Sequence, residues 1–587
     1  MFLNRVALKQ FFQRPGLAKT RRFLRLVVIL CAIILAVSIV TTLTVDLGPA
    51  LREVAETQGS NLIDRPMRIG RLSVLLWRGD FIVEDLYIEG LTPDARPFLT
   101  AGRITLSVPW GALLSQRLVF DAIEMTDWRM YVETHPDGQH NFIRVTTTGS
   151  GGNSNWTTTL QYVRAHRGEF EFDDFGANWS TVARNLDVIV SRPNTEYIGQ
   201  GKFSDGTVRI ADFLPMSADL ETTFKIDGSN ILFDRIQVDS DGAKSVLSGV
   251  ADVSRWPEMT YQIDSDIKFP LMREIFFAEN QFTLDGDGKF VGSWHIYRGG
   301  RELKGMFSSQ KFSVNKFHFE DVRGELLWLP DLLDITKASA TMYSGGVDFS
   351  YRMDLLGESS PGFSKLKFDY AEVELLELTT FLELQGLHLQ GQASGYSDLI
   401  WPTGRFSDLN GEGIVQASPP AGVRLMTRDI SQTTILEIEN RLLQWGPFSS
   451  HRPLEPVAVG GELSYTLSPE WINLQGTIAT PKTWVGFDGR TSYGTRSRIP
   501  FSVTSENWQD SDRLLAGVLT AVGLPTSAIP VSGYGSFQGL MSKSFRQPRF
   551  EGEFIGEEMR AWDVLWGSLR GKVIIENNYA DVRDVVI

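Results

Sequence analysis

Apolar and polar residues alternate along most of the chain, which is the pattern of β-strands with one apolar and one polar face. The first clear example is a strand, a bend at Arg78-Gly79-Asp80 and a second strand. The apolar positions of this pair are Ile69, Leu72, Val74, Phe81, Val83, Leu86 and Ile88. The pattern therefore predicts a hairpin near the start of a strand-rich region.

The alternation continues to the last residues of the chain. It predicts a strand over 101–108, two strands over 117–133 and a turn at Pro136-Asp137-Gly138. Further on it predicts a hairpin around Asp227-Gly228 and many similar pairs. Roughly 30–35 strands at about 4.8 Å spacing would build an element on the order of 150 Å long, which is of the order of the gap between two envelope membranes.

Four short segments have helical features instead. They cover 49–58, with Pro49 early and Gly59 as a stop, and 271–279, 373–384 and 510–522. The last begins with Asp510 as a cap, and its apolar residues recur at helical spacing.

The strand region also contains an internal repeat. Residues 324–349 and 461–488 both begin Gly-Glu-Leu, enter a turn that contains proline, and return as an alternating strand. Each then passes an aromatic residue, Tyr343 or Trp484, into a further strand, and the final segment from Ser568 starts in the same way. Such repetition suggests units that bury their apolar faces by adding to their neighbours.

One stretch departs from the alternation, because residues 26–45 contain no charge and 13 Leu, Ile or Val. A helix of 20 residues is about 30 Å long, enough to cross the hydrocarbon core of a bilayer. The preceding 25 residues carry seven basic and no acidic side chains, which predicts a cytoplasmic N-terminus. The anchor positions are Leu26, Leu30, Ile34, Val37 and Val45.

A cleaved secretory signal is the alternative for this stretch. Its apolar part is usually about 7–15 residues and is followed by a small-x-small cleavage site. Here the run is longer and continues as VDLGPALRE. We therefore expect an uncleaved anchor, with the rest of the chain exported on either interpretation.

Charge and cysteine content limit the functions that the exported part can have. The net charge is −14, and the first 25 residues hold +7, so the remainder holds −21. An acidic exported region argues against nucleic-acid binding and against a polybasic lipid-surface patch. The single cysteine, Cys31, lies inside the apolar run, so the exported part has no disulfide. A long exported chain of this kind fits a bacterial envelope.

No motif predicts catalysis or a cofactor. His135 and His140 flank a turn without a surrounding ligand cluster, and we interpret them as surface residues. Asp239-x-Asp241-Gly242 and residues 285–288 lack the later ligands of a calcium loop, so we interpret both as hairpin turns. Gly533-x-Gly535 lies in a strand-like run. We expect no catalytic residue, metal or cofactor, and an envelope hydrolase is a distant alternative.

The apolar row on each strand has two interpretations. It could pack the core of closed sandwiches, or it could line a trough that solvates acyl chains. We favour the trough because the strand region exceeds 500 residues without obvious breaks into compact domains. The candidate lining residues are Phe224, Ile226, Ile231, Phe233, Ile236, Val238, Phe317, Phe319, Leu326, Trp328 and Ile335.

The N-terminal region resembles the AsmA/TamB superfamily of bacterial envelope proteins, including the TamB-like translocation and assembly module. The matching elements are the anchor, the short helix with Gly59-Ser60-Asn61, the segment 65–70 that enters the first strand, and the segment 79–90. The turn at 135–142, HPDGQHNF, resembles the family's dGxxN signature. The likeness covers residues 1 to about 145, and beyond them it is one of general style.

This resemblance implies a mainly β fold in which a transmembrane helix precedes an elongated, curled and repetitive antiparallel β-groove. It implies phospholipid movement from the inner to the outer membrane by a non-enzymatic protein, with phospholipids as partners and no nucleic acid. The alternative function that it implies is a scaffold for outer-membrane protein insertion or secretion, with an outer-membrane barrel protein as partner. The last predicted strand runs to Ile587 without an identifiable barrel-contacting domain, which suggests a fragment or a shorter relative.

The predicted organisation follows the same order. It comprises a cytoplasmic segment 1–25, the anchor 26–45, a helix and the start of the groove over 46–148, and a Gly/Ser/Asn/Thr linker over 149–156. Groove repeats then occupy 157–385 and 386–587.

Overall fold

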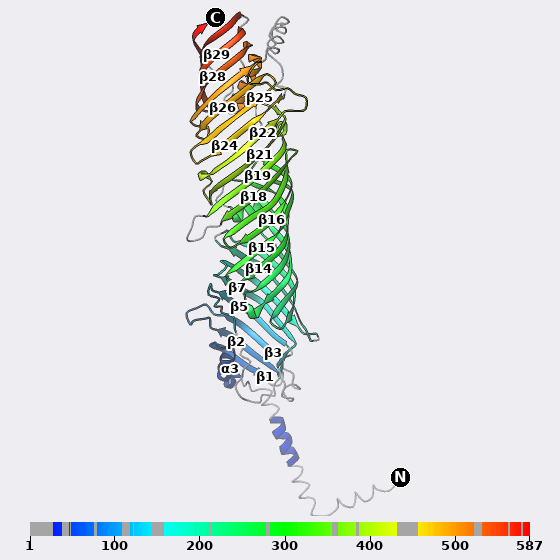
Figure 1. Ribbon diagram of the computed structural model, residues 1–587. Coiled ribbons are helices and arrows are strands. Elements are labelled where there is room, and N and C mark those ends of the chain that lie inside the picture. Colours follow the sequence, from blue (N-terminus) through cyan, green and yellow to red (C-terminus); the bar gives the residue numbers. More distant parts are fainter. Residues whose placement is uncertain are drawn as a thin grey trace, which may run out of the picture. The chain divides into compact units, whose positions relative to one another are not determined.

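The computed structural model describes most of the chain beyond residue 45. The described residues are 27–37, 46, 48–75, 79–107, 118–120, 122–143, 158–193, 195–211, 213–277, 282–315, 317–354, 362–382, 387–430, 456–521, 531–561, 564–576 and 579–587. The predicted linker 149–156 lies outside them. The protein is mainly β, with 67% strand, one long antiparallel sheet and few helices (Figure 1). The predicted fold class is confirmed at this level.

The chain is divided into two compact units, which are described separately. Unit 1 comprises residues 1–261 and 296–299, and unit 2 comprises residues 262–295 and 300–587. Within the described residues, the main sheet has 27 strands, and two further pairs, β4–β6 and β20–β23, are separate.

In unit 1 the described residues comprise the helical segment 27–37, then helix α3 and a series of strands. The elements are α3 (Gly48–Ile63), β1 (Met67–Leu75), β2 (Asp80–Ile88), β3 (Leu99–Ser107), β4 (Leu118–Phe120), β5 (Ala122–Thr134), β6 (Thr158–Leu160), β7 (Tyr162–Asp174), β8 (Trp179–Ser191), β9 (Tyr197–Ile210), β10 (Met216–Asp227), β11 (Asn230–Ser240), β12 (Ala243–Asp252) and the short 3-10 turn η1 (Val253–Arg255). Paired strands are antiparallel, except that β5 pairs parallel with β7 and β4 pairs parallel with β6.

Unit 2 continues the same pattern, and its described residues include the three helices α5, α6 and α8. The elements are β13 (Met259–Lys268), α5 (Phe269–Phe276), β14 (Leu284–Tyr297), β15 (Gly300–Val314), β16 (Phe317–Leu329), β17 (Leu332–Met342), β18 (Gly345–Asp354), β19 (Phe363–Glu374), α6 (Leu375–Phe381), β20 (Leu389–Gln390), β21 (Gln392–Pro402), η2 (Phe406–Asp408), β22 (Asn410–Ser418), β23 (Val457–Ala458), β24 (Gly460–Leu467), β25 (Ile472–Ala479), β26 (Thr483–Thr491), β27 (Ser497–Ser505), α8 (Trp508–Ala521), β28 (Val531–Ser544), β29 (Gln547–Ala561), β30 (Val564–Glu576) and β31 (Tyr579–Val586). The first residues of β13 and the last of β14 belong to unit 1.

The sheet of unit 1 is curved. The rings of Phe172 on β7 and Trp256 after β12 lie 5.6 Å apart. Five strand steps of about 4.8 Å separate β7 from β12, so a flat sheet would hold the two rings more than about 20 Å apart. In unit 1, non-glycine residues with positive φ lie on β2, β5, β7, β8 and β9, at Asp85, Asp127, Arg167, Asn185 and Asp205. Register shifts accompany some of them, as expected of β-bulges, which bend and twist a strand.

The internal repeat recurs at equivalent places in unit 2. Among the described residues, six main-sheet strands (β14–β19) separate α5 from α6, and six (β21, β22 and β24–β27) separate α6 from α8. The two Gly-Glu-Leu copies lie on β16 and β24, and the related segment from Ser568 lies on β30. Each is the third main-sheet strand after a helix, so the predicted repeat corresponds to a six-strand block with one helix.

Several predicted elements need correction. The first helix does not stop at Gly59 but continues to Ile63, because Gly59 leaves room for the Met67 side chain of β1. Val373 and Glu374 belong to β19, so the third helix starts at Leu375. The last helix starts at Trp508, and the side chain of Asn507 caps it by accepting a hydrogen bond from Gln509 N–H at 3.0 Å.

The two aspartate-glycine segments behave differently. Asp241 and Gly242 form the predicted hairpin turn between β11 and β12. Residues 285–288 are not a turn but lie within β14, where Asp287 pairs with Lys268 at 2.8 Å.

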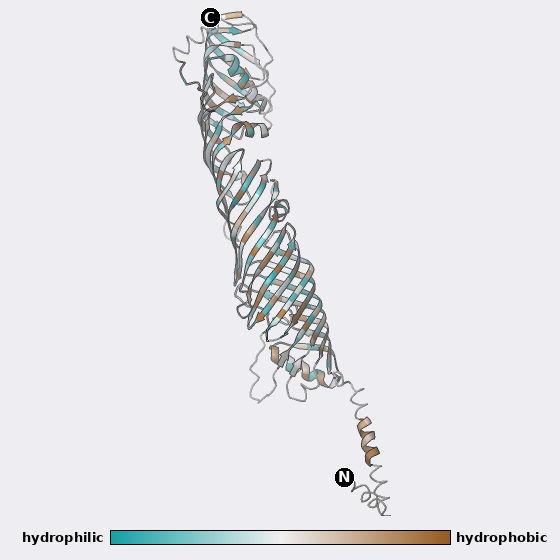
Figure 2. Ribbon diagram, turned by 90° about the vertical axis from the view of Figure 1, so that its right-hand side faces the viewer, coloured by the Kyte–Doolittle hydropathy of each residue, from teal (hydrophilic) through white to brown (hydrophobic). Residues whose placement is uncertain are grey.

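The predicted membrane segment is only partly described. Residues 27–37 are helical, and their large apolar side chains are exposed (Figure 2). Leu26 and Val45 lie outside the described residues. Within the part of the chain that the structure describes, no helix is long and apolar enough to cross a membrane.

Candidate functional site

The two faces of the sheet differ in chemistry in each unit. In unit 1 we define the inner face as the one that carries the buried cluster around Leu72, Trp128 and Phe172. In unit 2 it is the face on which α5 and α8 pack, through Phe269 on Phe312 and Trp508 on Phe554. Along the strands in Figure 2, hydrophobic and hydrophilic positions alternate, as expected of two unlike faces.

The outer face carries cross-strand ion pairs. In unit 1 they join Arg167 to Asp127 at 2.6 Å and Lys244 to Asp239 at 2.8 Å, and in unit 2 they join Lys337 to Glu325 at 3.0 Å. These side chains are largely exposed, so each pair adds little stability. They keep the outer face hydrated.

The inner face has aromatic side chains directly opposite glycines. In unit 1 the pairs are Phe224 with Gly199 and Phe233 with Gly249. In unit 2 they are Phe307 with Gly324, Tyr370 with Gly395, Tyr465 with Gly413, Phe487 with Gly476, Phe501 with Gly539 and Phe554 with Gly571.

Four of these glycines, Gly199, Gly324, Gly395 and Gly413, leave space that the opposite aromatic side chains occupy. A Cβ added to Gly199 would overlap the Phe224 ring, and one added to Gly324 would lie 2.6 Å from the Phe307 ring. The rings at these four positions therefore lie against the neighbouring strand instead of standing away from the sheet. Such pairing protects a strand glycine.

All eleven predicted lining residues belong to this face, in two groups. In unit 1, Phe224 and Ile226 on β10 face Phe233 and Ile231 on β11, and the bulge after Phe233 returns Ile236 and Val238 to the same side. Only Ile236 is buried among these six, while the other five are partly exposed.

The second group lies in unit 2. Leu326 on β16 pairs directly with Ile335 on β17, and Trp328 contacts Phe276 of α5 at 5.5 Å. Phe319 contacts Phe312, which also meets α5. Phe317 is 41% exposed and contacts Phe381 of α6. The alternation pattern thus identified the face. The helical segments predicted at 271–279 and 373–384 correspond to α5 and α6, but their packing on this face was not predicted.

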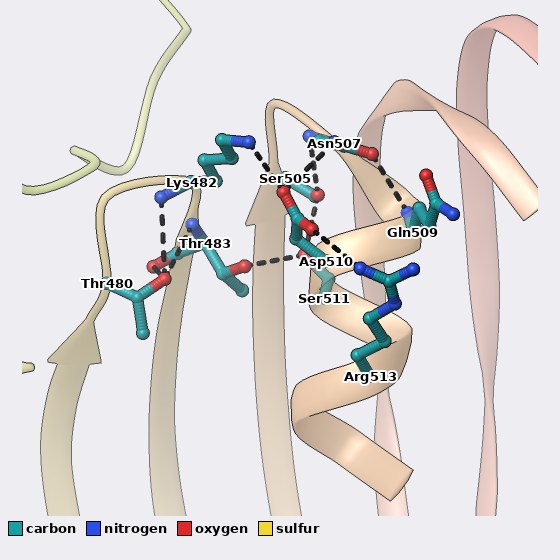
Figure 3. Close-up of polar contacts among 9 residues, drawn as sticks. All are labelled: Thr480, Lys482, Thr483, Ser505, Asn507, Gln509, Asp510, Ser511 and Arg513. Carbon is teal, nitrogen blue, oxygen red and sulfur yellow. Dashed lines mark hydrogen bonds and ion pairs between the residues drawn. The ribbon is translucent and has the colours of Figure 1, made fainter. Parts of the chain in front are cut away.

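A polar network fixes the N-terminus of α8 to the sheet (Figure 3). The buried Ser511 hydroxyl lies 2.6 Å from the hydroxyls of both Thr483 and Ser505. Asp510 accepts a hydrogen bond from Lys482 Nζ at 2.6 Å. Ser and Thr at strand ends gave no signal in the sequence because their partners come from three distant segments.

The dGxxN-like turn has a structural role. The fully buried Asn141 accepts a hydrogen bond from Glu133 N–H at 2.9 Å and donates one to the Tyr131 carbonyl at 2.8 Å. The Asn141 side chain thereby hydrogen-bonds backbone groups of β5 that lie past Leu99, where the partner strand β3 starts. The His135 ring stacks on Phe175 at 5.2 Å. Neither predicted histidine belongs to a group suited to metal binding within the described part of the chain.

Two tyrosines of unit 1 have strongly raised pKa values. Burial is the main cause of the raised pKa of Tyr261, and at Tyr131 burial acts together with the hydrogen bond to Asp173 at 2.9 Å. Both hydroxyls therefore stay protonated at neutral pH, and neither is poised for acid–base chemistry.

An open hollow of about 600 Å³ lies over β24–β27. Most of its lining side chains point to the outer face, and they include Glu462, Ser464, Gln475, Thr477 and Asp488. Its lining is mixed, because Gly476, Phe487 and Phe501 of the aromatic–glycine pairs also contribute to it. Comparison with known sequences gives no further guidance, because no protein-family model and no curated protein matches this chain.

Proposed function

We propose that this protein is a non-enzymatic lipid conduit of the bacterial envelope. Residues 26–45 anchor it in the inner membrane with a cytoplasmic N-terminus, and the strand region lies in the periplasm. Phospholipid acyl chains contact the inner face of the sheet, which forms a curled groove, and move along it toward the outer membrane.

The observation that carries this proposal is the aromatic–glycine face. A sealed core would bury its large apolar side chains, whereas Phe224, Phe233, Leu326 and Trp328 keep partial exposure. An acyl chain placed against them would remove apolar surface from water, which is worth about 0.8 kcal/mol per methylene. The charged outer face supports the same orientation, because it favours contact with water.

Site-specific photo-crosslinking tests the proposal. A photoreactive amino acid is placed at Phe233, Phe319 or Trp328 on the inner face, in the full chain expressed in a bacterial envelope. The matched controls are Val246 and Met306, which are apolar and 42% and 64% exposed but lie on outer-face positions of β12 and β15.

Phospholipid adducts are expected at the three inner positions and not at the two controls. Equal labelling of both sets would indicate non-specific contact with lipid. Absence of adducts at all inner positions would contradict the conduit.

A further inference from the structure

Strand β1 pairs with β2 along one edge, and helix α3 contacts its other edge. Glu56 accepts a hydrogen bond from Ile69 N–H at 2.7 Å, and Ser60 accepts one from Met67 N–H at 2.9 Å. Arg52 donates to the Gly70 carbonyl at 3.2 Å. Side chains of the helix thus satisfy edge groups that another strand would otherwise pair. This arrangement fixes one side of α3 against the sheet.

Asp46 joins the helix to the same strand at its other end. Its carboxylate accepts hydrogen bonds from Gly48 N–H at 2.9 Å and from Val74 N–H at 2.7 Å. Gly48 is buried, and a Cβ there would overlap the Leu72 carbonyl. The residue that follows the apolar run 26–45 is therefore already fixed to the sheet.

A second side of α3 exposes apolar residues to solvent. Leu51, Val54 and Leu62 are 40%, 56% and 52% exposed. At 100° per residue they lie within about 80° of one another, together with Gln58. Glu56 and Ser60, which hold β1, point about 120–180° away from them. The stripe therefore lies roughly opposite the side that holds the sheet.

We propose that α3 lies in the membrane–water interface and inserts Leu51, Val54 and Leu62 into the bilayer surface. The inference rests on the proposed anchor, because only Asp46 and Leu47 separate Val45 from α3. Three residue steps span at most about 11 Å, so a helix that starts there begins at the interface. An interfacial helix typically buries its apolar side about 5–10 Å into the headgroup region.

We therefore assign a phospholipid surface as the partner of the stripe. The short connection from Val45 to α3 brings the stripe to that surface. The 16-residue helix, about 24 Å long, would then hold the β1 edge of the inner face at the bilayer.

Fluorescence quenching on the full chain tests this placement. Cys31→Ser removes the native thiol, and Leu51→Cys, Val54→Cys or Leu62→Cys introduces one site for an environment-sensitive fluorophore. The protein is reconstituted in vesicles of phosphatidylethanolamine and phosphatidylglycerol that contain a lipid quencher. Glu53→Cys is the matched control, because residue 53 is exposed on the same helix but points about 150° away from the stripe.

Quenching is expected to be roughly threefold stronger at the three stripe positions than at residue 53, because interfacial helices immerse one side only. Vesicle flotation of the same samples reports the anchor separately. If the protein floats but the stripe is quenched no more than residue 53, the inference is overturned and the anchor stands. If it does not float, the anchor fails, and the inference fails with it.

Discussion

The ring of Phe224 lies over Gly199, its direct partner on the neighbouring strand. Gly199→Val should push this ring away from β9 and into the space above the inner face. We expect reduced phospholipid co-purification and crosslinking at residue 233, together with a modest loss of stability, because overpacking typically costs about 1–3 kcal/mol. Mass spectrometry of bound lipid and chemical denaturation measure the two effects.

Gly346→Val is the matched control for that substitution. Gly346 also lies in a strand, but an added Cβ there would meet nothing within 4 Å. Its lipid content should equal that of the unsubstituted protein. Equal lipid loss in both variants would contradict the role assigned to the glycine.

Asn141→Ala should be strongly destabilising. It leaves the Glu133 N–H and the Tyr131 carbonyl without their side-chain partner in a buried position. Two unsatisfied groups predict a loss of about 2–4 kcal/mol in the free energy of unfolding. Urea denaturation measures it, and Gln139→Ala in the same turn is the control. Similar midpoints for both variants would refute the role of Asn141.

The contact of Asp46 with β1 should depend on pH. The Val74 N–H is the largest cause of its lowered pKa. A carboxyl whose pKa is lowered on folding stabilises the fold above its unfolded value of about 3.9, and this contribution is lost as pH falls through the folded value. Relative to its intrinsic rate, amide exchange of α3 should therefore accelerate as pH falls below about 3.9, and Asp46→Ala should accelerate it at pH 7. Unchanged exchange in the Asp46→Ala variant would contradict the proposal that Asp46 holds α3 against β1.

The Ser511 network should control local opening of α8. Ser511→Ala removes the hydroxyl between Thr483 and Ser505, and we expect a loss of about 1–3 kcal/mol. Hydrogen exchange should rise in α8 before it rises in β16 or β17. Ser407→Ala, at an exposed turn, should leave α8 unaffected. If hydrogen exchange rose equally across the chain, the Ser511 network would not act locally on α8.

A charge on the inner face should block lipid movement without unfolding the protein. Val238→Asp and Ile335→Asp each place a carboxylate among partly exposed apolar side chains. We expect lipid transfer between donor and acceptor vesicles to fall, because desolvating the carboxylate is costly. Gln237→Asp, which adds the same charge to the outer face of β11, should transfer normally. Normal transfer by Val238→Asp would contradict the groove assignment.

Local alternation was sufficient to predict most strands and, within each unit, the face on which Phe233 or Leu326 lies. Their partners could not be predicted, because a directly opposite glycine depends on strand register, and register depends on bulges such as the one after Phe233. Helix starts were misplaced where tertiary contacts decided them. Asn507 caps α8, whereas Asp510 binds Lys482 from another hairpin. The edge contacts of α3 gave no sequence signal, since Glu56 and Ser60 are ordinary helix-surface residues.

The six-strand block of unit 2 has a consequence for how such a chain can lengthen. An even number of antiparallel strands returns the backbone to the side from which it started, so α5, α6 and α8 precede strands of the same direction. A block could then be duplicated or deleted without reversing any later strand. Each would change the reach of the sheet by about 29 Å, at about 4.8 Å per strand. The number of six-strand blocks would then determine the length of the sheet.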